Sequence, residues 1–459
     1  MAEKLRILLV NNYAGRGGIP RAVATLANGL AARGHDVVVM SRKPVPKLLR
    51  PLYALGHTIN VLSLPPGKRA PLPIGSEGIS AVFPLDPAVR VEGFSFSDKN
   101  LKIQALRKRI MRIAPGACVC PLADGAHLVW AVTLMGSGIP YVYSERSAPA
   151  AVEDVFWSRK GRLAAMSGAD AIHLLLPEYV GSVPPFLRNR VRVIPNAVDV
   201  PARAADTAGA ERKIFLWLGR LFEEAKQCCL ALEAFARVAG RFPEWDFHVA
   251  GDGPDKKTIH ACAESLGLGE RITFLGESEN PEILLTSAQA FCFSSRFEGM
   301  SNALLEAMAA GLPCVAFSGC PGVSSIICDG ETGLLAKKMT AAELAAQMAA
   351  LMRSPSLRHR LGSAARTSMA AFSSGAVTDA WEKLLYDMAR RKGHTVMDAF
   401  RSEPFASRAR LAARARQEWA LRDFGQPMPD SIERKILAIP GILKKTARDL
   451  AKTFPRKRP

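Results

Sequence analysis

The stretch "AFCFSSRFEGMSNALLEAMAAGLPCVAF", residues 290–317, contains one complete strand–helix–strand unit. An apolar run ends at Phe293, a polar turn follows, and a helical pattern then places Leu304 and Met308 on one face. A Gly-Pro break separates that helix from a second apolar run at 314–317. Strands that alternate with helices in this order predict a parallel sheet covered by helices.

Similar units occur in both halves of the chain. In the first half, a glycine-rich loop and a helix separate the apolar runs 6–10 and 36–41, and further runs alternate with helices in the second half. With 459 residues, the chain is too long for one core. We therefore predict an α/β protein with two doubly wound, Rossmann-like domains that face a cleft, at 1–199 and 200–375, followed by a basic helical tail at 393–459.

The composition predicts a folded protein with anionic partners. Hydrophobic residues make up 48% and charged residues 22% of the chain, and the formal net charge is +19. Positive charge favours nucleic acid, an acidic membrane surface or phosphorylated ligands. Aromatic residues make up only 7%, without a basic-aromatic motif, so we do not expect a nucleic-acid binder. The chain also lacks Asp-x-Asp and any His/Cys cluster with ligand spacing, so we expect no metal or other cofactor.

Two glutamates flank the turn in the opening stretch. Glu298 lies in the turn and Glu306 lies two helical turns into the helix, which Ser301 or Asn302 can cap. A carboxylate accepts two hydrogen bonds and so suits a vicinal diol. The backbone N–H groups of the turn would meet sugar hydroxyls or phosphate oxygens. These N–H groups belong to Gly299, Met300, Ser301 and Asn302. The alternative is a capped surface helix with exposed glutamates.

Two other strand ends carry residues suited to an anion. After the first strand, Gly17 and Gly18 precede a helix, where small residues let backbone N–H groups approach a phosphate. After the strand at 213–218, Arg220 and Lys226 could hold a diphosphate between them. The alternatives are a plain tight turn at the glycines, and a Lys226 neutralised by Glu223 or Glu224.

These motifs together resemble glycosyltransferase family 4, whose members are retaining sugar transferases of the GT-B fold. The resemblance rests on "EGMSNALLE", on "GRL" followed by a lysine, and on "VIPNAVD", "GDGP" and "ITFLG". It covers roughly residues 5–392 and is strongest over 213–335. Within this family, the chain resembles most the bacterial enzymes that build surface polysaccharide or lipid-linked oligosaccharide.

The resemblance implies a role for each motif. Arg220 and Lys226 would hold the nucleotide diphosphate, Glu298 with the backbone of 299–302 the donor sugar, and Glu306 the ribose. It further implies that Gly17 and Gly18 bring the other domain's backbone to the phosphates, and that the "ITFLG" turn lies near the base. The helix at 376–392 would cross back to the first domain.

Two positions depart from the family pattern. Arg146 stands where many members have a histidine, and it would contact donor or acceptor in the catalytic site. Ser325 stands in place of a glutamate in the segment "PGVSSII". We see no protein nucleophile, which favours a front-face mechanism in which the diphosphate oxygen helps deprotonate the acceptor and cations stabilise the leaving group.

The resemblance implies a metal-independent, retaining hexosyltransferase. It would move a hexose or N-acetylhexosamine from a nucleotide-sugar, expected to be a UDP-sugar, to a lipid-linked or polysaccharide acceptor of the cell envelope. The alternatives are a nucleotide-sugar 2-epimerase and a degenerate, non-catalytic binder of sugar nucleotides.

The two ends of the chain predict where such an enzyme would work. The N-terminus reads as a first strand and not as a signal peptide, so we expect a cytoplasmic protein. The tail holds fifteen Lys and Arg against seven Asp and Glu. Its last part has an apolar stripe flanked by these bases, which suits peripheral attachment to an anionic membrane surface; a packed helix or a disordered end is the alternative.

Overall fold

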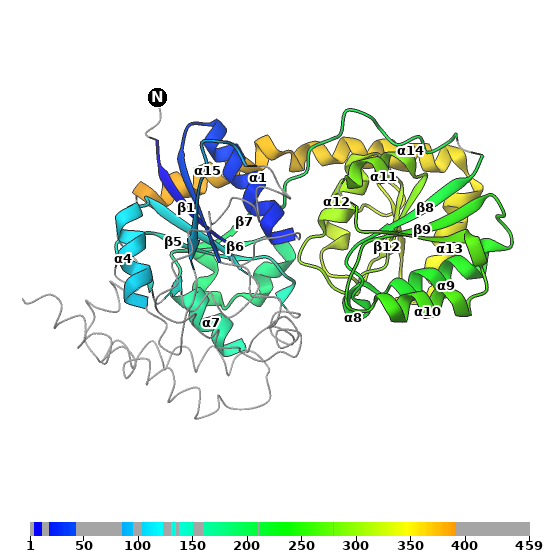
Figure 1. Cartoon of the computed structure of the whole chain (residues 1–459), viewed down its shortest axis with the longest axis horizontal. Helices are drawn as coiled ribbons and strands as arrows, with labels where there is room; N and C mark the ends of the chain where they lie inside the picture. Colours follow the sequence, from blue (N-terminus) through cyan, green and yellow to red (C-terminus); the bar gives the residue numbers. More distant parts are fainter. Residues whose placement is uncertain are drawn as a thin grey trace, which may run out of the picture.

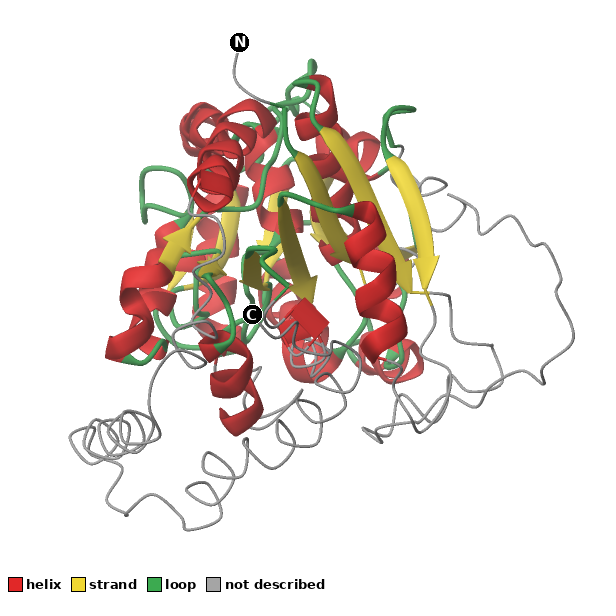
Figure 2. Cartoon of the chain, turned by 90° about the vertical axis from the view of Figure 1, so that its left-hand side faces the viewer, coloured by secondary structure: helices red, strands yellow, loops and turns green. Residues whose placement is uncertain are grey.

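The computed structural model describes two α/β domains, each with a central parallel sheet between layers of helices (Figures 1 and 2). This confirms the predicted fold class. The described residues are 4–11, 18–42, 85–94, 103–122, 130–131, 133–134, 137–149, 159–209, 211–278 and 280–390.

The first domain has a seven-stranded sheet in the order β3-β2-β1-β4-β5-β6-β7, and all neighbouring strands are parallel. The strands are β1 (Arg6–Asn11), β2 (Asp36–Arg42), β3 (Arg90–Phe94), β4 (Ala117–Leu122), β5 (Tyr141–Glu145), β6 (Ala171–Leu174) and β7 (Val191–Val193). The helices between them include α1 (Gly18–Ala32), α4 (Ile103–Ile113) and α7 (Arg159–Ser167).

The second domain repeats this plan with a six-stranded sheet in the order β10-β9-β8-β11-β12-β13. Its strands are β8 (Lys213–Leu218), β9 (Trp245–Ala250), β10 (Ile272–Gly276), β11 (Ala290–Phe293), β12 (Cys314–Phe317) and β13 (Leu334–Ala336). Its helices are α8 (Glu223–Lys226), α9 (Cys228–Ala239), α10 (Lys256–Ser265), α11 (Pro281–Ser287), α12 (Asn302–Ala309), α13 (Ala341–Arg353) and α14 (Pro355–Ser368). In both sheets the strand order reverses beside the first strand, and ligands of doubly wound folds bind at such a switch point.

Alternation along β1 shows how the core forms. Ile7 and Leu9 point to one face of the sheet and Leu8 and Val10 to the other, and all four side chains are fully buried. A central strand of a doubly wound sheet is covered on both faces, so every position is apolar. The Ile7 face packs against α1 and against a helix from the end of the described chain, α15 (Ser374–Arg390).

The chain crosses between the domains twice, and the two crossings are hydrogen-bonded to each other. The Val198 amide donates to the Phe372 carbonyl at 2.8 Å. The carboxylate of Asp199 accepts from the Ser374 amide at 2.9 Å and from its hydroxyl at 2.6 Å. After the second crossing, α15 lies along α1 of the first domain (Figure 1). The predicted tail at 393–459 lies outside the described residues.

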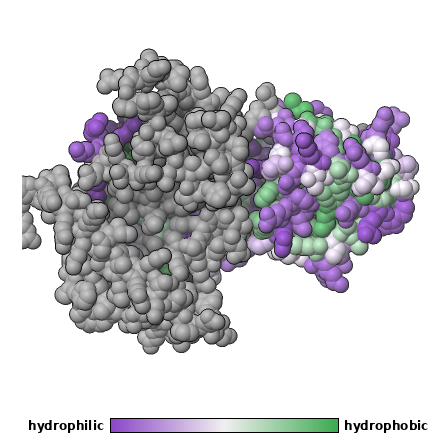
Figure 3. Space-filling model, turned by 60° about the horizontal axis from the view of Figure 1, so that its bottom comes forward, coloured by the Kyte–Doolittle hydropathy of each residue, from purple (hydrophilic) through white to green (hydrophobic). Residues whose placement is uncertain are grey.

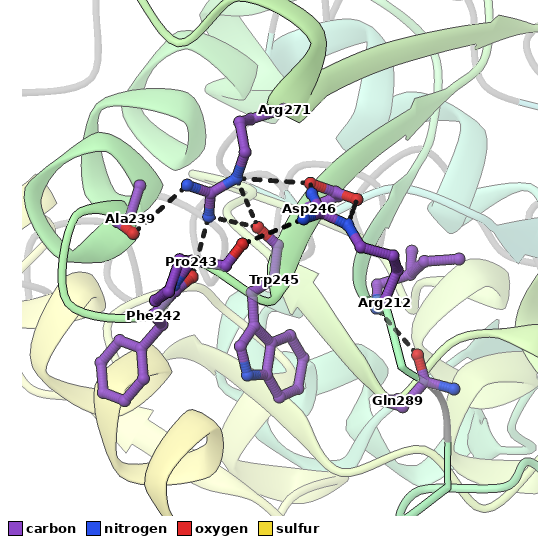
Figure 4. A network of polar contacts seen from close by, with 9 residues as sticks. Arg212, Ala239, Phe242, Pro243, Trp245, Asp246, Arg271 and Gln289 are labelled. Carbon is purple, nitrogen blue, oxygen red and sulfur yellow. Dashed lines mark hydrogen bonds and ion pairs between the residues drawn. The ribbon is translucent and has the colours of Figure 1, made fainter.

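A polar network holds together the amino ends of β8 and β9 in the second sheet (Figure 4). The Arg271 guanidinium donates to the carbonyls of Trp245, Phe242 and Ala239, and it lies 3.3 Å from a carboxylate oxygen of Asp246. These contacts satisfy backbone carbonyls at the end of α9 and the start of β9. On the outer surface, hydrophilic and hydrophobic residues are interspersed over this domain (Figure 3).

Candidate functional site

The switch point of the second sheet brings three of the predicted residues to one place. Arg220 follows β8, and Glu298 follows β11, the strand on the other side of the reversal. The Lys226 ammonium forms an ion pair with the Glu298 carboxylate, and both side chains are largely buried. Arg220 is exposed and lies two residues after the carboxyl end of β8. Two cations and one carboxylate thus lie where ligands of this fold class bind.

Glu298 has one oxygen committed to the protein. Lys226 and the Ser295 hydroxyl both donate to Oε1, the latter at 3.0 Å. Within the described residues no hydrogen bond goes to Oε2, so this oxygen can accept from a ligand hydroxyl. The ammonium of Lys226 has three donors and can serve Glu298 and a second anion together.

Lys226 ends the short helix α8, and Gln227, which is left-handed with φ of 48°, separates it from the long helix α9. The partner of Lys226 is Glu298, and not Glu223 or Glu224. The Glu223 carboxylate instead accepts from the Cys229 amide at 3.1 Å, and burial raises its pKa.

Two helix N-termini from different domains face each other near this edge. Ser301 caps α12 by accepting from the Leu304 amide, as the sequence predicts, and Asn302 is the first helical residue. Gly18 begins α1, and a Cβ atom there would lie 3.5 Å from Nδ2 of Asn302. Helix N-termini carry partial positive charge and unpaired N–H groups, so this junction suits an anion. Gly17 lies outside the described residues.

Glu306, the predicted ribose ligand, is paired across the domain interface. Its carboxylate forms an ion pair with Arg21 of α1, and its side chain is 12% exposed against 40% for Arg21. Burial raises the pKa of Glu306, and the Arg21 charge partly offsets this. A nucleotide that used this carboxylate would therefore compete with Arg21.

Arg146, Asn196 and the turn after β11 form a second contact between the domains. The Arg146 guanidinium donates to Oδ1 of Asn196 at 2.6 Å. Nδ2 of Asn196 donates to the Met300 carbonyl at 2.9 Å and to Oδ1 of Asn302 at 2.8 Å. Burial lowers the pKa of Arg146 to about 10, so it stays charged at neutral pH. Arg146 therefore adds a cation beside the turn.

A pocket opens beyond the carboxyl ends of β8, β9 and β10. It is lined by Leu221, Gly251, Lys256, His260, Phe274, Leu275 and Gly276. The rings of His260 and Phe274 stack with centroids 3.8 Å apart. The "ITFLG" segment, which the resemblance places near the base, contributes Phe274, Leu275 and Gly276 to the lining of this pocket.

Several residues of the site carried no sequence signal strong enough to single them out. Arg21, Asn196, Glu178 and Tyr179 all contact the second domain from the first. Asn196 lies in the "VIPNAVD" motif, whereas Glu178 and Tyr179 follow an ordinary apolar run. Ser325, the departure from the family glutamate, donates its hydroxyl to Glu178.

Among the described residues, no helix is both long and apolar enough to span a bilayer. No cluster of three or more His, Cys, Asp or Glu side chains suited to a metal occurs in the same part of the chain.

Comparison with known proteins connects this geometry to sugar transfer. Residues 202–368 match the family described as glycosyl transferases group 1. The chain is 22% identical over 378 residues to an uncharacterized glycosyltransferase of Haemophilus influenzae, covering 82% of this chain and 98% of that protein. It is 24% identical over 374 residues to the "GalNAc-alpha-(1->4)-GalNAc-alpha-(1->3)-diNAcBac-PP-undecaprenol alpha-1,4-N-acetyl-D-galactosaminyltransferase" of Campylobacter jejuni, covering 81% and 96%.

A solved structure supports the same fold. The crystal structure of Anabaena HepE in complex with UDP and glucose superposes with a TM-score of 0.64 at 16% identity, covering 83% of this chain and 99% of that one. Together these matches support a glycosyltransferase with the GT-B fold. They do not favour an epimerase or a non-catalytic binder.

Proposed function

We propose that the chain is a retaining glycosyltransferase of family 4 that moves a hexose or N-acetylhexosamine from a UDP-sugar to a lipid-linked or polysaccharide acceptor. The observation that carries this proposal is the grouping of Arg220, Lys226 and Glu298 at the switch point, with Glu306 eight residues further on. Cations for a diphosphate and carboxylates for sugar hydroxyls are the side chains that such a donor needs.

In the proposed reaction, the bond between the anomeric carbon and the diphosphate breaks, and a bond to the acceptor oxygen forms on the same face. The acceptor proton passes to the departing phosphate oxygen. Arg220 and Lys226, with the N-termini of α1 and α12, offset the charge that grows on the diphosphate. Glu298 orients the sugar through its Oε2, and no protein nucleophile or metal takes part.

The relatives support the choice of donor and acceptor. HepE was solved with UDP and glucose, and the C. jejuni relative is named for a PP-undecaprenol acceptor. A lipid-linked acceptor lies at a membrane, and the basic tail at 393–459 would attract the chain to an anionic surface. We therefore propose a cytoplasmic enzyme that attaches peripherally to the inner face of the plasma membrane.

Mass spectrometry of the products tests the proposal. A panel of UDP-sugars is incubated with an undecaprenyl-diphosphate-linked sugar, with and without EDTA, and NMR of the product gives the anomeric configuration. We expect one sugar to be added with retention and without a need for metal. Glu298→Gln should abolish transfer, whereas Glu264→Gln, the same change on the exposed face of α10, should not.

Three results would contradict parts of the proposal. Conversion of a UDP-sugar without any acceptor would indicate the epimerase. UDP binding without any product across the panel would indicate a non-catalytic binder. Activity that EDTA abolishes and Mg²⁺ restores would overturn the metal-independent mechanism.

A further inference from the structure

The turn between β11 and α12 is held at residues 298–300 by side chains of the opposite domain. The Tyr179 hydroxyl lies 2.7 Å from the Glu298 carbonyl and 2.8 Å from the Gly299 carbonyl, and it donates to this pair. The next carbonyl, that of Met300, accepts from Asn196. Three consecutive carbonyls of the turn therefore point to the first domain.

This arrangement determines where the amide groups of the turn point. In a trans peptide, the C=O and N–H groups point in opposite directions. Because the carbonyls of Glu298, Gly299 and Met300 face the first domain, the N–H groups of the following residues face away from it. Consecutive N–H groups on one side form a small anion- or oxygen-binding concavity.

The segment that carries Tyr179 is itself fastened to the second domain. Tyr179 lies in a 3-10 helix, Pro177–Ser182, which begins three residues after the end of β6. The Glu178 carboxylate accepts from the Gly322 amide and from the Ser325 hydroxyl. Tyr179 is buried and Glu178 is exposed, so Tyr179 makes the inner contact to the turn, and Glu178 makes an outer contact to the loop at 322–325.

Glycines allow the close approach on both sides. A Cβ atom at Gly299 would collide with the backbone of Arg146 and Ser147. A Cβ atom at Gly322 would lie 2.6 Å from a methyl of Leu176 and 3.1 Å from the Tyr179 hydroxyl, and Gly322 has a φ of 87°. A side chain at Gly299 would therefore force the backbones of the two domains apart, and one at Gly322 would be strained by the positive φ.

We propose that Tyr179 is a positioning residue for the transfer reaction, because its hydroxyl orients the turn that binds the donor sugar when the two domains are together. This inference rests on the proposed function. Tyr179 touches no reacting atom; it acts through the backbone of Glu298 and Gly299. The contact joins the domains, so a correctly shaped turn forms only when the first domain is in place, which couples donor orientation to closure of the cleft.

The test compares Tyr179→Phe with Tyr386→Phe in the full chain. Both changes remove one hydroxyl and keep the ring, and Tyr386 lies on α15, which packs on the far side of the first sheet. Hydrogen exchange of the 296–304 segment, the melting temperature, UDP affinity, kcat and KM are measured for each variant, with the donor and acceptor that the product analysis identifies.

For Tyr179→Phe we expect exchange about fivefold faster in the 296–304 segment alone. The kcat should fall about tenfold or more, since small misplacements of bound groups lower rates strongly. The UDP affinity should stay as in the unchanged protein, and the melting temperature should fall by a few degrees at most, because only one donor to the two carbonyls is lost. Tyr386→Phe should change neither the exchange of this segment nor kcat.

Two results would overturn the positioning role. One is unchanged exchange and unchanged kcat in Tyr179→Phe. The other is a loss of kcat that accompanies faster exchange throughout the chain and a melting temperature lowered by much more than a few degrees, which would make the hydroxyl merely structural. Failure of the proposed function is separate: there the unchanged protein transfers no sugar at all, while local exchange still reports whether Tyr179 holds the turn.

Discussion

Lys226 and Glu298 share a hydrogen bond at the switch point, so each sets the electrostatic surroundings of the other. If Lys226 and Arg220 stabilise the departing diphosphate, they act more strongly on the transition state than on bound UDP. Lys226→Ala and Arg220→Ala should each lower kcat/KM by about 10² or more. Lys213→Ala, at the opposite end of β8, is the control and should leave kcat/KM unchanged. Near-normal kcat/KM in both site variants would mean that the diphosphate does not bind beside Arg220 and Lys226.

Glu306 has two possible partners, Arg21 in the structure and the ribose in the proposed complex. Glu306→Gln should weaken UDP binding about tenfold, since a hydrogen bond to a charged group contributes about 1.5–3 kcal/mol. Arg21→Gln removes the competing ion pair and should leave UDP binding as tight or tighter. Calorimetry measures both variants. Equal losses of affinity would mean that the ion pair itself, and not the carboxylate, supports the site.

His173 makes the first domain sensitive to acid. Burial lowers the pKa of His173 to about 3, with a further lowering by the Arg146 charge, while the Ile194 carbonyl opposes it. The neutral ring lies 2.7 Å from that carbonyl and 2.8 Å from the Ser144 hydroxyl, and it packs against Trp381 of α15.

The sign of the effect follows from the two states. The unfolded chain takes up a proton near its ordinary pKa of 6.5, before the folded chain does, so stability falls as pH drops from 6.5 towards 3. The loss approaches about 1.4 kcal/mol per pH unit. Urea unfolding at several pH values should show a shallower pH dependence for His173→Gln. Parallel curves for the two proteins would contradict a buried neutral histidine.

Among the elements, the strands of the second sheet have different roles at their two ends. Their carboxyl ends form the candidate ligand site, and their amino ends are held by Arg271, which donates to three backbone carbonyls. Arg271→Ala leaves these carbonyls unpaired and should lower the free energy of unfolding by about 2 kcal/mol. Arg212→Ala, on the exposed side of the same network, should lower it much less, because solvent screens an exposed ion pair. Urea unfolding measures the loss, and UDP affinity should change in neither variant. A weakened UDP affinity in Arg271→Ala would mean that the amino ends of these strands affect the ligand site at their carboxyl ends.

The sequence predicted most strands from their apolar runs and missed β3, β4, β7 and β13, whose signals are weak. β8 to β12 follow the predicted runs, and the predicted inner face of α12 is buried. β7 and β13 have only three residues each, too few for a period, and β4 reads "ACVCPL", with little β-branched character. β3 lies at the end of a Pro- and Gly-rich stretch that gives weak signals.

The same limit applies to the site. Lys226 and Glu298 could be grouped from sequence, because parallel strands bring their carboxyl ends to one edge. The pairs Arg21–Glu306 and Asn196–Met300 join different domains. Such contacts depend on how the domains are placed, which hydrophobic periodicity within each domain does not encode.

For the whole molecule, the uneven charge of the chain leads to a prediction about membranes. Removal of residues 431–459 takes away Lys435, Lys444, Lys445, Arg448 and Lys452, each contributing about 1 kcal/mol near an anionic surface. The shortened chain should sediment less with anionic vesicles and lose activity on a membrane-borne acceptor, while it keeps its UDP affinity. Neutral vesicles are the control. Equal sedimentation of both chains, at low and at physiological salt, would refute the anchor.

The double crossing between the domains has a consequence for how such a protein can be recombined. The first domain is built from two separate stretches of chain, because α15 covers α1 and the Ile7 face of the sheet. A chimera that exchanged only residues 1–199 would place a foreign sheet under α15 and mismatch Trp381, Leu384 and Leu385 with their new neighbours. An exchange of the first domain therefore requires that α15 travels together with residues 1–199.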